Sequence, residues 1–247
     1  MKIIGDIGNT EIKICVFAND KNYIKKIVLK TNLISKYYLT RKLFFLKKYS
    51  KKINIALFCS VVPAAYKKIK FFLKYNSNID CKEIKETKLE NFLKIKANKK
   101  QIGSDRLANA IGVIDNKFNY IILDFGTATT FDVVIKNQYL GGVIAPGVNL
   151  SLNTLIDKAS LIPKIKLSKT VNIVGKDTKN AIRGGFYWGY AGLIDNIIKL
   201  IIKQTKNPFK IIFTGGQAHL FKNAIKAKVN VDKDLTIKGV MKVAKNL

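Results

Sequence analysis

The chain has 247 residues, of which 48% are hydrophobic and 25% are charged, so it can bury the core of one large domain or two ordinary ones. No apolar run reaches the roughly 18 residues of a membrane span, and Asp6 interrupts the segment where a signal peptide is apolar. We therefore expect a cytoplasmic protein with no membrane partner.

The formal net charge of +29 is unusually high for a globular chain. Nearly all of the positive charge is lysine, because arginine occurs only at positions 41, 106 and 183. The planar arginine fork is the preferred reader of bases and phosphates, and isoleucine and asparagine are abundant as well. We therefore interpret the lysine content as coding bias toward A and T and expect no nucleic-acid partner, with a polyanion-binding surface as the alternative.

The sequence gives no reason to expect a site for a soft metal. Cys15, Cys59 and Cys81 are far apart and show no metal-ligand spacing, and His219 is the only histidine. The thiols are expected to stay reduced in the cytoplasm.

The first half of the chain predicts an α/β unit that begins with a hairpin. The turn after the first strand contains Gly8 and Asn9, which we expect to supply positive φ angles. Ser104 suits the N-cap of the last helix of this half, and a Lys-rich loop over 94–102 precedes it. The predicted strands are 2–6, 11–18, 23–29, 53–59 and 81–85, and the predicted helices are 32–49, 64–75 and 104–116.

The second half repeats this plan. A long helix near 178–203 contains four glycines at close spacing, which costs helix stability and predicts close packing against a partner element. A loop-rich segment over 158–177 precedes this helix. The other predicted strands are 120–124, 129–136, 139–144, 210–213 and 227–230, and the other predicted helices are 148–157, 217–226 and a terminal helix from about 235.

One short pattern occurs once in each half. A strand ends in Asp6, passes through Ile7-Gly8-Asn9-Thr10 and resumes, and another ends in Asp124 and passes through Phe125-Gly126-Thr127-Ala128. This repetition indicates an internal duplication. Two β-β-β-α-β-α units in tandem predict two actin-like (ribonuclease H-like) ATPase domains, 1–116 and 117–247, with a nucleotide cleft between them.

The first turn has the chemistry of a phosphate loop. Gly8 allows close approach of a ligand, the turn N–H groups can point at an anion, and Thr10 and Lys13 add a hydroxyl and a cation. Asp6 would repel phosphate unless a cation lies between them, so it implies Mg²⁺, held directly or through water. The alternative interpretation is an ordinary Asx-Gly hairpin turn.

The second turn offers similar groups. Gly126 gives close approach, Thr127 offers a hydroxyl, and Asp124 can again hold a cation. Thr214-Gly215-Gly216 follows a strand and precedes a helix, where an adenine or ribose can lie against bare backbone.

Asp105 is the candidate catalytic base. It lies in Gly103-Ser104-Asp105-Arg106 at a helix N-terminus, where the helix dipole stabilises an anion. A base for phosphoryl transfer must stay ionised and reach the acceptor hydroxyl, and it need not be strong because the transition state is loose. Arg106 can orient a carboxylate. The alternative is a surface acid at the start of a helix.

Together these residues resemble the type III pantothenate kinases of the acetate and sugar kinase/Hsc70/actin superfamily. The resemblance runs nearly end to end and depends on the joint order of its motifs: DIGNT at 6–10, SVVP at 60–63, GSDR at 103–106, DFGTATTFDVV at 124–134, GGVIAPG at 141–147, GKDT at 175–178, GGFYWGYAGLID at 184–195, FTGG at 213–216 and DLTIKGV at 234–240.

The resemblance implies a role for each matching position. Asp105 is the base that takes the proton from the primary hydroxyl of pantothenate. Asp124 holds a monovalent cation, K⁺ or NH₄⁺. Thr178 contacts pantothenate across the interface of a homodimer. The implied ATP-binding residues are Asp6, Ile7, Gly8, Asn9, Thr10, Glu11, Ile12, Lys13 and Thr127, and the implied pantothenate-binding residues are Gly103, Ser104, Asp105, Arg106 and Thr178.

The expected activity is ATP-dependent phosphorylation of pantothenate to 4′-phosphopantothenate, the first step of coenzyme A biosynthesis, with Mg²⁺ as a cofactor. The sequence departs from the family at Lys96, which stands where the family has a tyrosine lining the pantothenate pocket, and at Lys99, which stands where it has a proline. Lys96 favours one alternative, a small-molecule kinase of the same superfamily with another acceptor. The net charge of +29 favours a second alternative, a non-catalytic, basic nucleotide-binding regulator.

Overall fold

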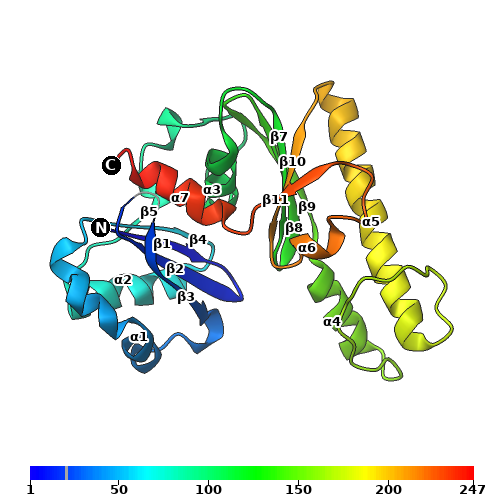
Figure 1. The fold of residues 1–247 in the computed structure, drawn as a ribbon, viewed down its shortest axis with the longest axis horizontal. Helices are drawn as coiled ribbons and strands as arrows, with labels where there is room; N and C mark the ends of the chain where they lie inside the picture. Colours follow the sequence, from blue (N-terminus) through cyan, green and yellow to red (C-terminus); the bar gives the residue numbers. More distant parts are fainter. Residues whose placement is uncertain (20–21) are drawn as a thin grey trace. The chain divides into compact units, whose positions relative to one another are not determined.

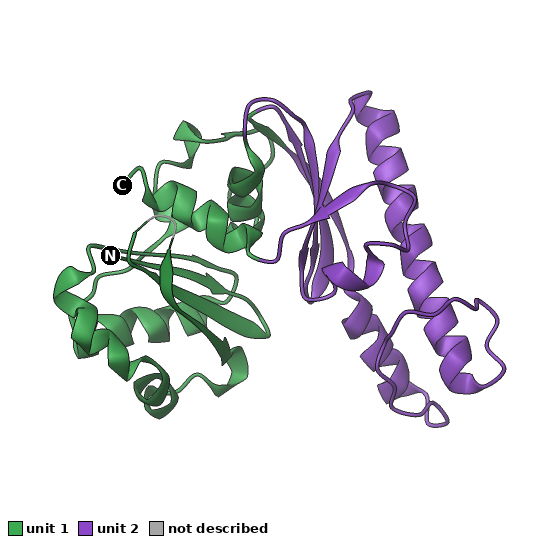
Figure 2. Cartoon of the chain, in the orientation of Figure 1, with its two compact units in different colours: residues 1–114, 137–139, 234–247 green, residues 115–136, 140–233 purple. Residues whose placement is uncertain are grey.

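A computed structural model describes residues 1–19 and 22–247. The chain forms two compact units, shown in different colours in Figure 2. Unit 1 contains residues 1–114, 137–139 and 234–247, and unit 2 contains residues 115–136 and 140–233. The predicted domains, 1–116 and 117–247, stay a prediction, and the compact units differ from them chiefly at residues 234–247, because the last helix packs on unit 1.

Unit 1 is built on a five-stranded mixed sheet in the order β3-β2-β1-β4-β5. β1 pairs antiparallel with β2 and parallel with β4, and β2 pairs antiparallel with β3. The bounds are β1 (Lys2–Ile7), β2 (Glu11–Phe17), β3 (Tyr23–Lys30), β4 (Ile55–Ser60) and β5 (Lys82–Glu83).

Helices cover both faces of this sheet, α1 and α2 on one and α3 and α7 on the other (Figure 1). Alternation along the strands explains this, because Ile3, Ile7 and Phe58 share a buried cluster with residues of α1 and α2. The helical segments are η1 (Thr31–Leu33), α1 (Lys36–Leu43), η2 (Phe44–Lys52), α2 (Pro63–Ser77), η3 (Ile84–Glu86), η4 (Leu89–Asn91), α3 (Ser104–Val113) and α7 (Leu235–Ala244).

Helix α7 is integral to unit 1 although it lies at the end of the sequence. A Cβ at Gly239 would overlap the carbonyl oxygen of Ala108, so the two helix backbones touch directly. The buried Thr236 hydroxyl donates to Asn109 Oδ1 at 2.9 Å, and Lys26 forms an ion pair with Asp234 just before the helix. Glycine at 239 therefore allows α3 and α7 to pack at short range.

Unit 2 repeats the strand succession of unit 1. Its strands run β9-β8-β7-β10-β11, which matches β3-β2-β1-β4-β5, and β6 (Lys94–Ile95) pairs with Gln138 and Tyr139 at the start of β9. This topology confirms the predicted tandem α/β architecture. The bounds are β7 (Tyr120–Phe125), β8 (Ala128–Ile135), β9 (Gln138–Pro146), β10 (Lys210–Gly215), β11 (Val229–Val231), α4 (Val148–Lys158), α5 (Thr178–Thr205) and α6 (Ala218–Phe221).

The two faces of the unit 2 sheet carry different residues. Ile121, Leu123 and Phe125 pack in one cluster with buried residues of α4, α5 and α6. The alternate positions, Ile122 and Asp124, lie on the opposite face. Among the described residues, no helix combines the length and apolar character needed to cross a membrane.

Two local predictions are wrong. The predicted helix 32–49 is α1 followed by the 3₁₀ segment η2; Leu39, Leu43 and Leu46 are buried, and the spacing falls from four residues to the three of a 3₁₀ turn. The expected positive φ angles at Gly8 and Asn9 are absent, since neither is among the described positive-φ residues. Four residues, 8–11, separate the paired Ile7 and Ile12, and such longer hairpin loops do not need the left-handed region.

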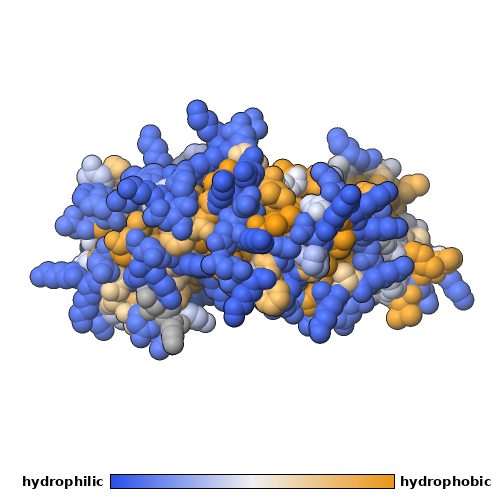
Figure 3. Space-filling view, turned by 90° about the horizontal axis from the view of Figure 1, so that it is seen from above, coloured by the Kyte–Doolittle hydropathy of each residue, from blue (hydrophilic) through white to orange (hydrophobic). Residues whose placement is uncertain are grey.

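Two further elements differ in extent. The predicted loop 94–102 contains the short strand β6, whose pairing with β9 is not local. The predicted helix 217–226 is α6, which ends at Phe221. In Figure 3, hydrophilic side chains cover most of the face in view and hydrophobic ones form separate patches.

Candidate active site

The first hairpin turn is held in shape by a residue outside it. Thr31 Oγ1 donates to the carbonyl oxygen of Gly8 at 2.7 Å, and the Thr31 N–H donates to the carbonyl oxygen of Thr10 at 3.0 Å. Gly8 N–H donates to Glu11 O at 3.0 Å and closes the turn. The carbonyl oxygens of Gly8 and Thr10 therefore accept hydrogen bonds within unit 1. Their negative ends point at Thr31 and do not face an anion bound at the turn.

Asp6 and Asp105 lie around one buried cysteine in unit 1. Asp6 pairs in register with Cys59 of the parallel strand β4, and the Cys59 thiol donates to Asp6 Oδ1 at 3.5 Å. Burial raises the pKa of Cys59 well above its usual value, and the negative charges of Asp6 and Asp105 act in the same direction. The thiol therefore keeps its proton and remains a donor to Asp6.

Asp105 lies in the first turn of α3, whose start is fixed to the end of β4. Ser104 Oγ donates to Ser60 O at 3.2 Å, and a Cβ at Gly103 would overlap the Asp105 carboxylate, so Gly103 leaves room for that group. Burial raises the pKa of Asp105 above its ordinary value, while the Arg106 N–H, which donates to Oδ1 at 2.8 Å, and the Arg106 charge oppose the shift.

In unit 2, Asp124 lies against the turn that follows β10. Asp124 and Thr214 are register partners in the parallel pair β7–β10, and Gly216 N–H donates to Phe125 O at 3.1 Å. Gly215 has φ +84°, and a Cβ there would lie 2.5 Å from Asp124 Oδ1 and 2.6 Å from Phe125 N. Glycine at 215 is therefore needed both for its backbone angle and for the Asp124 carboxylate.

The surroundings of Asp124 fit a hard cation. Thr130 is its partner across the antiparallel pair β7–β8, so the two side chains lie on the same face. Thr130 Oγ1 is buried without a hydrogen-bond partner among the described residues. Carboxylate and hydroxyl oxygens suit hard cations rather than soft metals.

Thr127 lies in the second hairpin turn, close to the start of α4. Gly147 N–H donates to Thr127 O at 3.1 Å, and a Cβ at Gly147 would overlap the carbonyl oxygens of Gly126 and Thr127. Three residues, 126–128, separate the paired Phe125 and Thr129, so this turn is one residue shorter than the first. The two turns share a topology and differ in loop length.

The other predicted site residues are distributed as follows. Ile7 ends β1, Asn9 lies in the exposed turn, and Glu11, Ile12 and Lys13 begin β2, where Lys13 pairs with Asp6. Thr178 begins α5 of unit 2 as an exposed residue, and the Asp177 side chain caps this helix by accepting from Asn180 N–H at 2.8 Å. The exposed Lys96 donates its backbone N–H to Tyr139 O.

Sequence reasoning missed three supporting residues: Thr31, Cys59 and Gly147. Each acts through a partner distant in sequence, so no local motif marks it. Thr127 lies in the FGTAT segment and Gly147 in the GGVIAPG segment, but neither segment indicates that these two residues are in contact. Cys59 was detectable only through its parallel register with Asp6.

Comparison with known proteins identifies the family of the chain. A family model described as type III pantothenate kinase matches residues 2–200. A type III pantothenate kinase from Pelagibacter ubique (strain HTCC1062) is 58% identical over 242 residues, covering 98% of each chain.

Solved structures show the fold alone. A Baf family transcriptional activator from Campylobacter jejuni has a TM-score of 0.59 at 21% identity, covering 99% of this chain and 98% of its own. A protein described as a sugar kinase from Cytophaga hutchinsonii has a TM-score of 0.53 at 13% identity, covering 99% of each chain.

The duplicated sheets, each opening with an acidic hairpin, define a member of the actin-like ATPase and sugar kinase fold class. Within that class, the chain belongs to the type III pantothenate kinase family. It is therefore a kinase.

Proposed function

We propose that this enzyme transfers the γ-phosphoryl group of ATP to the primary hydroxyl of pantothenate with Asp105 as the base, in the first step of coenzyme A biosynthesis. The proposal rests on family membership together with one observation: Asp105, held at the start of α3, and Asp6, at the end of β1, both lie around Cys59. One acid acts on the acceptor and the other faces the nucleotide.

Asp105 has electrostatic properties suited to a weak base. Burial raises its pKa toward the working pH, which improves a general base, while the Arg106 N–H and charge keep the ionised form accessible. The acceptor proton passes to the Asp105 carboxylate as the oxygen attacks phosphorus. Because phosphoryl transfer has a loose transition state, positioning of the acceptor is the larger contribution.

ATP binds in this proposal at the two hairpin turns. Residues Asp6 to Lys13 cradle phosphates through turn N–H groups, the Thr10 hydroxyl and the Lys13 ammonium, and Thr127 contacts ATP from the second turn. The bonds that Thr31 makes to the Gly8 and Thr10 carbonyls support this role because they keep those dipoles away from the anion.

Two cations complete the proposed site. Asp124, with Thr130 beside it, would hold K⁺ or NH₄⁺, which offsets phosphate charge when bound. Asp6 would hold Mg²⁺, directly or through water. No group of three or more His, Cys, Asp or Glu side chains suited to a metal occurs among residues 1–19 and 22–247. Kinases bind Mg²⁺ with one or two carboxylates plus substrate phosphates, so Asp6 suffices.

Pantothenate binds at Gly103 to Arg106, and Thr178 completes the pocket from a second copy of the chain in a cytoplasmic homodimer. Support for the dimer comes from α5. Gly185, Gly189 and Gly192 are exposed, and a Cβ at each would meet nothing within 4 Å. Among the α5 glycines and the described residues around them, Gly184 alone touches another segment, because a Cβ there would overlap Ile173 O.

The deciding experiment is a coupled ADP-release assay with pantothenate on the wild type and Asp105→Asn. Loss of a general base is expected to lower kcat by about 100-fold or more. ATP affinity, measured by calorimetry, is expected to stay within about twofold of the wild type, because Asp105 does not face the nucleotide. Asp157→Asn, on the exposed surface of α4, is the matched control. Full activity in Asp105→Asn would remove Asp105 from its role.

A further inference from the structure

The positive charge of this chain is not spread evenly along it. Residues 21–79 contain fifteen lysines and arginines and no aspartate or glutamate. This segment is about a quarter of the chain and carries about half of its net charge of +29. Coding bias toward lysine does not explain the local absence of acids, so the segment needs a separate explanation.

The fold gathers much of this segment into one layer of unit 1. α1, η2 and α2 pack against one another on the same face of the five-stranded sheet (Figure 1). Their outward side chains include both lysines and aromatic rings. The most exposed rings are Tyr37 (77% exposed), Phe44 (62%), Phe71 (61%) and Tyr75 (73%).

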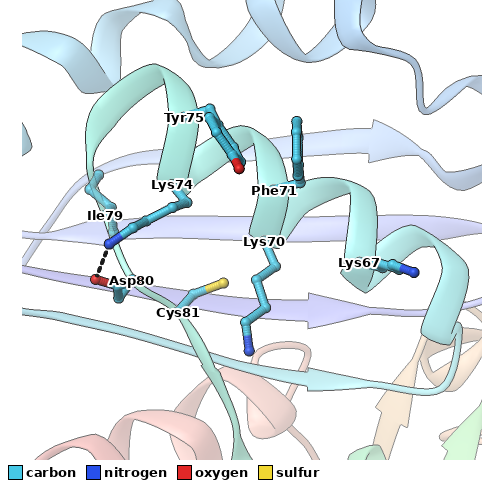
Figure 4. A pocket seen from close by; sticks show the side chains of 8 residues that line it. All are labelled: Lys67, Lys70, Phe71, Lys74, Tyr75, Ile79, Asp80 and Cys81. Atoms are coloured by element: carbon cyan, nitrogen blue, oxygen red, sulfur yellow. Dashed lines mark hydrogen bonds and ion pairs between the residues drawn. The ribbon is translucent and has the colours of Figure 1, made fainter.

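Helix α2 carries the clearest feature of this layer. Phe71 and Tyr75, one turn apart, hold their ring centroids 4.1 Å apart at an interplanar angle of 33°. They line a cavity of about 270 Å³ together with Lys67, Lys70 and Lys74. Figure 4 shows both rings on α2 and Lys74 bound to Asp80, at 2.7 Å.

We propose that this face of α2 binds single-stranded nucleic acid. Its recognition chemistry is a ring pair on which bases stack, flanked by lysines that neutralise the backbone phosphates. Base–aromatic stacking tolerates any sequence, and phosphate contacts carry no sequence information. Binding is therefore sequence-independent and dependent on salt. This inference revises the expectation from composition alone, and it is independent of the proposed kinase mechanism.

The same observations argue against other partners. Duplex readers favour arginine forks toward base edges, and α2 contains none. Membrane insertion needs a continuous apolar face, whereas the outward face of α2 interrupts its two rings with Lys67, Lys70 and Lys74. Single strands expose the bases that the rings can use.

The test is fluorescence anisotropy with a labelled oligothymidylate of about 16 nucleotides, titrated at several salt concentrations. Lys67→Gln/Lys70→Gln/Lys74→Gln is expected to reduce the slope of log K against log salt by about 1.4, since each phosphate contact contributes about 0.7 and Lys74 is already paired with Asp80. Phe71→Ala/Tyr75→Ala is expected to weaken binding about tenfold and to leave the slope unchanged. Both rings are exposed, so the core stays intact, and retained ADP-release activity verifies folding.

The matched control is Lys203→Gln/Lys222→Gln/Lys228→Gln, which removes three exposed lysines from unit 2. It is expected to bind like the wild type. If the control variant lost as much oligonucleotide affinity as the α2 variant, net charge alone would explain the effect and the proposal would be overturned. Unchanged binding by the ring variant would do the same, as would tighter binding to phosphatidylglycerol vesicles or self-association through the ring pair.

Discussion

Among individual residues, Asp105 combines two opposed demands. In its proposed role as a base it must be ionised, yet it is placed where burial disfavours the ionised form. Buried ionisable groups of this kind serve function and lower the stability of the folded state. The opposing contributions can be separated by measuring activity and stability on the same variant.

Asp105→Asn is expected to unfold at a temperature equal to or above that of the wild type at pH 7, despite losing activity. The raised pKa means that the ionised carboxylate destabilises the folded state above that pKa, and that this penalty disappears when the group is protonated at lower pH. Asparagine keeps an oxygen to accept the Arg106 N–H. Thermal unfolding between about pH 4 and pH 8 measures this, and the variant's advantage should shrink toward acid pH.

The wild-type kcat/KM is expected to fall as pH decreases through the raised pKa of Asp105. The expectation would be contradicted if Asp105→Asn were markedly less stable than the wild type at pH 7 while the control Asp157→Asn kept wild-type stability. That result would show that interactions beyond Arg106 stabilise the ionised Asp105 carboxylate in the folded state.

The sequence marked Asp105 as a candidate, because its motif is a continuous run of four residues at a helix start, and its role as a base stays a prediction. It did not identify Cys59 or Thr31, whose positions depend on the parallel register of β1 with β4 and on the return of the chain after β3. Pairing between strands distant in sequence is set by the whole fold, so single-residue patterns cannot reveal it.

At the level of elements, the turn after β10 leaves room for a carboxylate. Gly215 has both a positive φ and the Asp124 carboxylate at the position of its absent Cβ. Gly216, the next residue, has neither constraint. The adjacent glycines therefore form a natural comparison.

Gly215→Ala is expected to lower the free energy of unfolding by about 2 kcal/mol or more, because left-handed backbone alone costs an L-residue about 1–2 kcal/mol. It is also expected to displace Asp124 and raise the K⁺ concentration needed for half-maximal activity several-fold. Gly216→Ala should be nearly neutral in both. Denaturant unfolding and K⁺ titrations of activity measure the two effects. Similar behaviour of the two variants would contradict the role assigned to Gly215.

Most elements were predictable from the sequence, including both hairpins, which their turn residues indicate, and the long helix α5. The errors share a physical cause. The η2 segment departs from α-helix where the buried spacing shortens at Leu46, and the two-residue strand β6 exists only because β9 lies beside it. Tertiary contacts outweigh local propensity in both places.

For the whole molecule, the exposed glycine face of α5 is a surface shaped for close backbone approach. Gly185, Gly189 and Gly192 follow the i, i+4, i+7 spacing of one helix face. The neighbouring segment adds Val171 and Val174, which are 92% and 79% exposed. Because glycine has no side chain, a second backbone could approach this face closely.

Gly189→Arg is expected to convert the proposed dimer, of about twice 27.8 kDa, into a monomer, because the long charged side chain would fill the proposed interface. Activity should fall with it, since Thr178 is proposed to serve the partner's pocket. Light scattering after size exclusion gives the mass, and Gln204→Arg, exposed near the end of α5, serves as the control. An unchanged mass in Gly189→Arg would show that this face is not the interface.

The packing of α7 on α3 has a consequence for biosynthesis. A ribosome makes residues 115–233 after the first five-stranded sheet and before the helix that covers that sheet beside α3. During synthesis, Ala108 and Asn109 of the N-terminal half therefore stay uncovered until residues 234–247 have been made and α7 can pack on α3. Truncation before Asp234 would leave that half permanently incomplete and exposed to chaperones and proteases.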